Sequence, residues 1–202
     1  MAKVSLTSAD FTTRELLYSN RVWARNATHY EGTYSWGQTT GGSDYDVLVC
    51  DHADAAALTD TIIRSHWRYS SSAEPLLLLR SSQEDPGVEE IQNCFYMWHV
   101  GGNAFVYKRI NGTDYIFGFG PFAITNNQWY EIYFKLSTSG GNDTAIVKMR
   151  QAGGAWSTPV NQARAVDFQG ATISSGTFGV GSAYIAPGTY AYHDITQVSR
   201  EV

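Results

Sequence analysis

Long apolar runs, cysteine and charge are all scarce in this chain of 202 residues. The longest run of leucines, Leu76 to Leu79, is far shorter than the roughly 20 residues that cross a bilayer, so we expect no membrane span. Charged residues make up 16% of the chain and the net charge is −5, which excludes a general nucleic-acid binder because such a protein needs a basic surface. Only Cys50 and Cys94 could form a disulfide, and we expect both to stay reduced and buried.

An apolar leader and a helical period are missing too. The first residues, MAKVSLTSADF, do not resemble a secretory signal. We therefore expect cytoplasmic expression or a place on a virion surface rather than classical secretion, unless a signal lies outside this sequence. The alanine-rich piece Asp54 to Leu58 is long enough for about one helical turn, which excludes a helical domain.

What the chain does have is alternation of apolar and polar residues, which is typical of strands with one buried face. The clearest case is a hairpin within residues 126–150, where residues 139–142 (SGGN) supply the turn. One face is expected to be buried and to carry Tyr130, Ile132, Phe134, Leu136, Ala145, Val147 and Met149. The other face carries Trp129, Glu131, Tyr133, Lys135, Thr144, Lys148 and Arg150.

Similar patterns recur along the whole chain. Further strands are expected at Val4–Phe11, Tyr45–Asp51, Thr61–Ser70, Leu76–Arg80, Ile91–Val100, Ala104–Ile110, Tyr115–Phe119, Thr177–Gly181 and Thr189–Val198. Residues 20–40 fit two short strands or one long ordered loop, and residues 81–90 form an acidic loop. Because strand signals recur without any helix-length period, we expect all-β architecture, with residues 1–202 forming a single β-sandwich domain.

Three segments, in order, resemble the laminin-G-like, concanavalin A-like jelly rolls. They are LLLLRSS with CFYMWHVGGNAFVYKRING, then NNQWYEIYFKL, then ISSGTFGVGS with TYAYHDITQV, and they cover about residues 60 to 200. The resemblance implies a jelly roll of two curved antiparallel sheets, whose concave face binds or cleaves polysaccharide in many relatives. The chain departs from the pattern at His193, where an aromatic residue is usual before Asp194. No cofactor is required, but the resemblance allows a structural calcium ion with Asp194 as a candidate ligand.

The catalytic signatures of such folds are missing. The Glu-x-Asp-x-x-Glu motif of the retaining glucanases does not occur, and the acidic residues of segment 84–90 surround a Pro-Gly loop. Tyr133-Phe134-Lys135 resembles a lyase motif only in these three residues. His66 and His99 could serve as bases, although a lone histidine on a strand is more often structural. We therefore expect a protein without catalytic activity. The alternative of a polysaccharide-degrading enzyme with an unrecognised site stays open.

Aromatic side chains are plentiful, with 6 Trp and 13 Tyr, and flat rings stack on the apolar faces of sugars. The candidate carbohydrate-binding residues are Trp36, Trp98, Tyr96, Trp156, Arg64, His66, Arg68 and Arg80. For the four charged or titratable residues among them, a solvated outer face is an equally open interpretation.

These observations favour a non-catalytic, lectin-like module whose partner is a glycan or polysaccharide. The alternative is a structural or attachment component of a virion, such as a decoration, fibre or tail protein. Such a component would act through contacts with other subunits, in a homo-oligomer or a larger particle.

Overall fold

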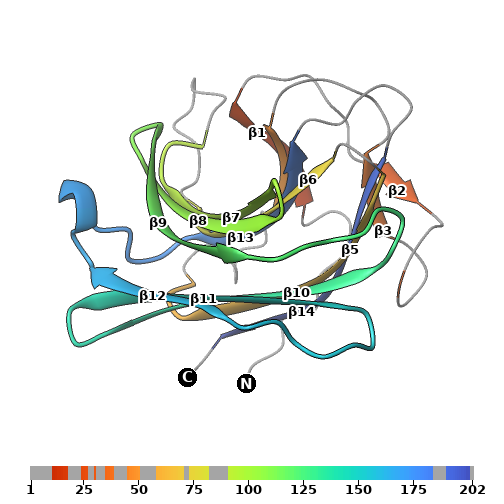
Figure 1. Cartoon of the computed structure of the whole chain (residues 1–202). Coiled ribbons are helices and arrows are strands. Elements are labelled where there is room, and N and C mark those ends of the chain that lie inside the picture. The colour runs from red at the N-terminus through yellow and green to blue at the C-terminus, as the bar shows by residue number, and fades with distance from the viewer. Residues whose placement is uncertain are drawn as a thin grey trace.

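Two antiparallel sheets of seven strands each lie face to face and form a β-sandwich (Figure 1). The structure is a computed structural model that describes residues 11–17, 24–26, 30, 35–38, 45–50, 58–70, 73–81, 91–183 and 190–200. The predicted all-β sandwich is confirmed. Within the described ranges, no helix has the length and apolar character needed to cross a membrane.

The first sheet is strongly curved and forms a trough whose concave side faces away from the second sheet (Figure 1). Its order is β1 (Phe11–Leu17), β4 (Tyr45–Cys50), β13 (Thr177–Ala183), β6 (Glu74–Ser81), β7 (Cys94–Val100), β8 (Asn103–Ile110) and β9 (Thr113–Pro121). We call it the curved sheet.

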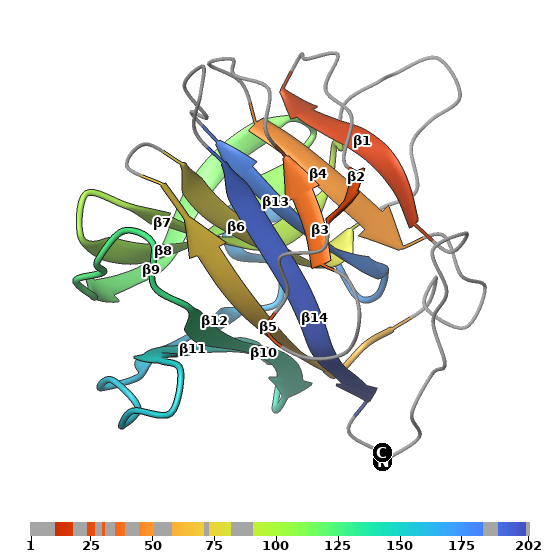
Figure 2. The same ribbon diagram turned by 90° about the vertical axis from the view of Figure 1, so that its right-hand side faces the viewer.

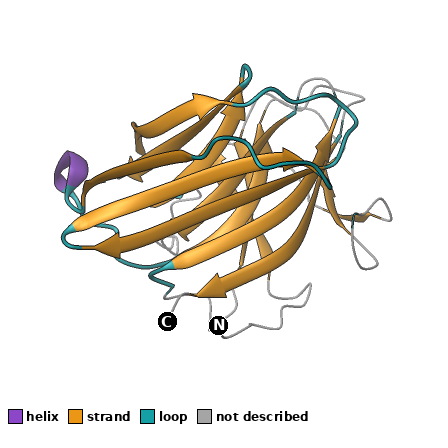
Figure 3. Ribbon diagram, turned by 60° about the horizontal axis from the view of Figure 1, so that its bottom comes forward, coloured by secondary structure: helices purple, strands orange, loops and turns teal. Residues whose placement is uncertain are grey.

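The second sheet is flatter, and its strands run side by side across the front of Figure 3. Its order is β12 (Val160–Ala165), β11 (Asn142–Gln151), β10 (Tyr130–Ser139), β5 (Thr61–Tyr69), β14 (Ala191–Arg200), β3 (Ser35–Gln38) and β2 (Ala24–Asn26). The C-terminal strand β14 therefore lies between β5 and β3, so that distant parts of the sequence pair in one sheet (Figure 2). A 3₁₀ turn, η3 (Phe168–Gly170), follows β12.

The predicted hairpin is confirmed as β10 and β11, and the predicted apolar face is the buried one. Gly140 and Gly141 form its two-residue turn with φ of 57° and 75°, a conformation that favours glycine. Similar turns join β7 to β8 at Gly101 and Gly102, and β8 to β9 at Asn111 and Gly112. These turn residues fix the register of both hairpins.

Most other predicted strands are found within a few residues of their expected ends. Residues 20–40 contain two short strands, β2 and β3, rather than only a loop. Of the predicted strand Val4–Phe11, only Phe11 is described, and β1 starts there and continues to Leu17. The predicted helical turn at residues 54–58 and the predicted acidic loop at residues 81–90 lie outside the described residues, apart from Leu58 and from Ser81, which ends β6.

Strand β12 was not predicted from the sequence, because its residues VNQARA carry few of the side chains that favour strands. It lies at the edge of the flatter sheet and packs beneath β9, the edge strand of the curved sheet. The packing is close: a Cβ added to Gly118 of β9 would lie 2.8 Å from Cβ of Gln162, and one added to Gly120 would lie 2.7 Å from Cγ2 of Val160. Glycine is therefore required where these two edges meet.

The main core fills the space between the sheets, and rings dominate it. Trp67 stacks on Tyr69 at a centroid distance of 4.2 Å, and Phe95 meets Phe117 edge to face at 5.4 Å. Complete burial of one such side chain contributes about 1.5–3 kcal/mol. The four leucines of β6 lie on both faces of the curved sheet. Leu77 and Leu79 face this core, while Leu76 and Leu78 belong to a second cluster on the concave side.

Two buried cations also hold the sandwich together. Lys108 of β8 is fully buried, and its Nζ donates to the backbone carbonyls of Val166, Phe168 and Ala171 at 2.8, 3.2 and 2.6 Å. Arg80 at the end of β6 pairs with Asp143 of β11 in the opposite sheet. Since both cations cross from the curved sheet to segments of the flatter side, they fix the spacing of the layers.

Cys50 and Cys94 are both buried, and neither takes part in a disulfide. Burial raises the pKa of the Cys94 thiol well above its ordinary value, because a thiolate would lose its hydration there. This state agrees with the expected buried, reduced cysteines.

Candidate functional site

The concave face of the curved sheet carries a row of aromatic rings across β7, β8 and β9. We call these residues the aromatic platform: Tyr96, Trp98, Phe105, Tyr107 and Phe119. Neighbouring ring centroids are 5.0 Å apart for Tyr96 and Tyr107, 6.0 Å for Trp98 and Tyr107, 6.1 Å for Phe105 and Tyr107, and 5.7 Å for Phe105 and Phe119. The rings lie together because alternate residues of paired strands point to one face.

Exposure increases along the platform from β7 to β9. Tyr96 is 3% exposed and packs on the apolar cluster of Leu76, Leu78 and Cys94, whereas Phe119 is 66% exposed. Trp98, Phe105 and Tyr107 lie between these extremes. The platform is thus anchored at its buried end and open to solvent at its outer end, which is what a stacking surface for a ligand requires.

Polar groups border the platform on two sides. The Trp98 Nε1 donates to Oε2 of Glu74 at 2.8 Å, and this bond fixes the plane of the indole. On the other side, Arg109 Nη1 forms an ion pair of 2.8 Å with Asp114 Oδ2, and Arg109 Nε donates to the Ile91 carbonyl. Burial raises the pKa of Glu74, and the hydrogen bond from Trp98 partly opposes this shift.

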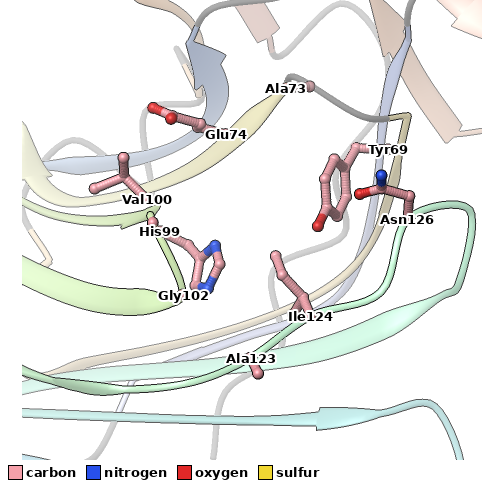
Figure 4. Close-up of a pocket in the computed structure, with 10 residues that line it drawn as sticks. Tyr69, Ala73, Glu74, His99, Val100, Gly102, Ala123, Ile124 and Asn126 are labelled. Atoms are coloured by element: carbon pink, nitrogen blue, oxygen red, sulfur yellow. The ribbon is translucent and has the colours of Figure 1, made fainter.

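A cavity of about 280 Å³ opens beyond Glu74, where the ends of β5, β6 and β7 meet the loop before β10 (Figure 4). Its described lining consists of Tyr69, Ala73, Glu74, His99, Val100, Gly101, Gly102, Ala123, Ile124 and Asn126. The Tyr69 hydroxyl and the His99 ring point into the same space (Figure 4). Glu74 therefore lines the cavity and also contacts the platform through Trp98.

Burial shifts the pKa values of two groups in the cavity, His99 and Tyr69, toward their neutral forms. Burial lowers the pKa of His99, while its hydrogen bond of 2.7 Å with the Phe122 carbonyl opposes the shift. Burial raises the pKa of Tyr69 to about 12, and the neighbouring Tyr130 adds to this effect. A neutral imidazole and a neutral phenol suit hydrogen bonds to hydroxyl groups.

The structure separates the predicted site residues into two groups. Trp98 and Tyr96 lie together on the concave platform. The predicted residues Arg64, His66, Arg68 and Trp156 lie on the outer face of the flatter sheet or beside it, on the opposite side of the molecule. His66 is 5% exposed and stacks on Tyr30 at 3.7 Å. These two groups cannot contact a single small ligand together.

Arg80 belongs to neither group, because it points into the core. Its φ is 51° and the register of β6 with β13 shifts beside it, so the alternation of side chains breaks after Leu79. The guanidinium is fully buried and donates to Thr138 Oγ1 at 2.7 Å and Asp143 Oδ1 at 2.8 Å. Arg80 was a candidate carbohydrate-binding residue, but its side chain connects the two sheets instead of facing the concave side.

Two further residues complete the comparison with the sequence. Trp36 lies in strand β3, but its side chain is outside the described residues. Asp194 is 8% exposed, and its Oδ2 accepts a hydrogen bond of 3.0 Å from the Tyr30 backbone N–H. Among the described residues, no group of three His, Cys, Asp or Glu side chains could hold a metal ion.

Phe105, Tyr107, Phe119 and Glu74 were not singled out from the sequence. The three rings do alternate with Val106 and Gly118 in the way that strand residues should, which was the available signal. Glu74 becomes significant only through Trp98, 24 residues away in the sequence.

No family model matches the sequence, and no curated protein matches it either. Several solved structures are nevertheless similar to this one. The carbohydrate-binding module CBM66 from Bacillus subtilis shares 13% identity, with 92% of this chain and 93% of that chain covered and a TM-score of 0.57. The metal-free carbohydrate recognition domain of Emp46p shares 8% identity, covers 94% and 87%, and has a TM-score of 0.57.

A third similar structure is the xylan β-1,4-xylosidase from Bacillus halodurans C-125, with 12% identity and a TM-score of 0.50. The similarity covers 83% of this chain but 33% of the xylosidase chain. At these identities the comparisons establish the fold and nothing finer. The chain has a concanavalin A-like jelly-roll fold, as the three sequence segments indicated.

Proposed function

We propose that this protein is a carbohydrate-recognition module that binds a neutral glycan or polysaccharide along the concave face of its curved sheet. The observation that carries the proposal is the aromatic platform, which runs from buried Tyr96 to open Phe119. Sugar rings present apolar C–H faces that stack on such side chains. The solved structures named as carbohydrate-binding module and carbohydrate recognition domain support the same use of this fold.

The polar groups around the platform supply the hydrogen bonds that fix a sugar in one orientation. The carboxylate of Glu74 accepts from hydroxyl groups, and so does that of Asp114, which the buried Arg109 holds in place. The cavity beyond Glu74 is at the small end of the range for ligand pockets, so it fits one sugar unit rather than a chain. A polysaccharide would therefore lie on the platform with its terminal unit at the cavity.

Binding fits this site better than hydrolysis does. A glycosidase of the usual kind needs two carboxyl groups, about 5–10 Å apart, on either side of the scissile bond. Among the described residues that line the cavity, Glu74 is the only acidic one. His99 is held neutral, but its Nε2 is engaged with the Phe122 carbonyl. We therefore propose a module without catalytic activity.

A second candidate function is an assembly component, for example a virion decoration or attachment protein. Phe119 and Ile116 are 66% and 50% exposed, and both lie on β9, which is an edge strand of the curved sheet. Exposed apolar side chains on an edge strand also suit contacts between subunits. The same residues would then be buried in a homo-oligomer instead of contacting a glycan.

One experiment separates these functions. The purified protein is screened on a glycan array and against insoluble xylan, mannan, cellulose and fructan, while light scattering gives its mass in solution. We expect a monomer that binds a neutral glycan, with at least tenfold weaker binding in Phe119→Ala and unchanged binding in the opposite-face control Trp156→Leu. A stable closed oligomer without any glycan signal would instead support assembly, and release of soluble sugar would support catalysis.

A further inference from the structure

The outer face of the flatter sheet carries a second concentration of aromatic and charged side chains. It consists of Arg64 on β5, Tyr133 on β10, Lys148 and Arg150 on β11, and Trp156 from the loop after β11. We call these five residues the cation–aromatic patch. Tyr133 is directly opposite Arg64 on one neighbouring strand and Lys148 on the other, so the strand register itself places cations on both sides of one ring.

The cations are held in fixed positions over the rings. Lys148 Nζ lies 4.6 Å from the Tyr133 ring centroid and 4.8 Å from that of Trp156. The guanidinium of Arg150 lies 4.4 Å from the Trp156 ring, and that of Arg64 lies 5.7 Å from the Tyr133 ring. Such contacts restrict the long side chains in the unbound protein. Binding of a ligand therefore costs less side-chain conformational entropy.

Positive charge exceeds negative charge within the patch. In the described ion pairs, both arginines share one carboxylate, that of Glu131. Its oxygens lie 2.5 Å from Nη2 of Arg150 and 3.9 Å from Nη1 of Arg64. Glu131 is itself 4% exposed, so it presents little negative charge to solvent. In the part of the chain that the structure describes, Lys148 forms no ion pair. The patch is therefore locally cationic on a protein whose net charge is −5.

Both rings of the patch already have cations packed against them. Trp156 already has Lys148 and Arg150 over it, and Tyr133 has Lys148 and Arg64. Single-stranded nucleic acid binds through bases that stack on accessible ring faces, so this arrangement favours a ligand recognised by its anionic groups alone. Arg64 and Lys148 lie on strands two spacings apart, roughly 10 Å, which suits an extended chain with regularly spaced charges.

We propose that the cation–aromatic patch binds an acidic polysaccharide, one that carries sulfate or uronate groups at regular intervals. The arginines and Lys148 contact the anionic groups, while Tyr133 and Trp156 hold these cations in place. The site is separate from the concave platform, since it lies on the opposite face of the sandwich.

The test uses heparin and polygalacturonate as probes, with dextran as the neutral comparison and a single-stranded oligonucleotide as the competing polyanion. We expect wild-type protein to bind heparin or polygalacturonate with an affinity that falls as salt rises, and not to bind dextran at this face. The charge reversals Lys148→Glu and Arg64→Glu should each weaken binding at least tenfold. Neutral-glycan binding on the platform should be the same in these variants as in the wild type.

Arg164→Glu is the matched control. Arg164 also lies over a ring, that of Phe168 at 4.8 Å, but it faces the opposite side of the flatter sheet, where its Nε donates to the Phe117 carbonyl. The same charge change at Arg164 should leave the affinity for heparin within twofold. A second readout, Trp156 fluorescence measured as the difference between wild type and Trp156→Phe, should change on addition of the probe.

Three results would overturn the proposal. They are no binding of either acidic polysaccharide, equal loss of binding in Arg164→Glu, or tighter binding of the oligonucleotide than of heparin. The last result would assign the patch to nucleic acid. Near-ultraviolet circular dichroism shows whether each variant is folded. If a variant is not folded, the fluorescence change of the wild-type protein on addition of the probe decides whether the patch binds it.

Discussion

The indole of Trp98 donates a hydrogen bond of 2.8 Å to the carboxylate of Glu74, and this single contact joins the aromatic platform to the cavity at its end. Trp98 belongs to β7 and Glu74 begins β6, so the bond crosses two adjacent strands of the curved sheet. A carboxylate that is held in this way has one orientation to offer to a ligand.

Removing that donor should change the acidity of the carboxyl group. Burial already raises the pKa of Glu74 and the Trp98 bond lowers it, so Trp98→Phe should raise this pKa further. Carbon-13 NMR titration of the Glu74 carboxyl group measures the shift. Trp156→Phe, on the opposite face, should leave the titration of Glu74 unchanged, and an unaltered pKa in Trp98→Phe would show that the bond does not persist in solution.

The buried pair of Arg80 and Asp143 should be essential for stability. Asp143→Ala leaves a guanidinium inside the sandwich without its carboxylate, which should lower the free energy of unfolding by about 3–5 kcal/mol. Asp60 lies 3.6 Å from the same guanidinium but is partly exposed, so Asp60→Ala should have a smaller effect, of about 1 kcal/mol. Urea denaturation checks both values, and equal losses would contradict the assignment.

Stability should fall in mild acid because of His193. Burial lowers the pKa of His193 to about 3, while its Nε2 donates to the Gly181 carbonyl at 2.7 Å. The unfolded chain binds a proton below its ordinary histidine pKa of about 6.5 and the folded chain does not, so unfolding becomes easier as pH falls from about 6.5 to 3. This histidine should contribute up to about 1.4 kcal/mol per pH unit in that window.

Thermal unfolding at pH values between 7 and 4 tests this dependence. His193→Gln keeps a donor for Gly181 and cannot be protonated, so its stability should change less over the same range. Burial lowers the pKa of His99 too, and the variant should therefore retain part of the acid sensitivity. A variant as sensitive to acid as the wild type would show that His193 does not contribute to it.

The contact between β9 and β12 should tolerate no side chain at Gly118. In Gly118→Ala the new methyl group would lie 2.8 Å from Cβ of Gln162, which is close to the backbone and cannot easily move away. We expect a loss of about 1–3 kcal/mol in the free energy of unfolding, measured by chemical denaturation. Gly140→Asn is the comparison, because its turn is open and asparagine tolerates positive φ, and its stability should stay within about 1 kcal/mol of the wild type.

The sequence predicts most of this fold because the strands bury one face and therefore alternate. The hairpin of β10 and β11 shows the rule at its clearest, with the predicted inward residues buried along both strands. Strand β12 could not be predicted from alternation of apolar and polar residues. Its inward residues, among them Val160 and Gln162, meet glycines of β9 rather than large side chains, so they did not need to be strongly apolar.

The site was predicted less completely than the fold. Alternation places Trp98 and Tyr96 on one face, but it does not reveal that this face is the concave one. Arg80 was a candidate carbohydrate-binding residue, with a solvated outer face equally open, but the left-handed backbone at this residue turns it into the core. Contacts such as that of Trp98 with Glu74 depend on strand pairing, which the sequence does not specify at single-residue precision.

The turn at Gly101 and Gly102 limits how mutation can change the size of the cavity. Both residues line the cavity with backbone alone, at φ of 57° and 77°, and no atom lies within 4 Å of the position of an added Cβ. Most single substitutions there would strain the backbone before they narrowed the cavity. A larger or smaller cavity would therefore arise at this rim by insertion or deletion of turn residues rather than by point mutation.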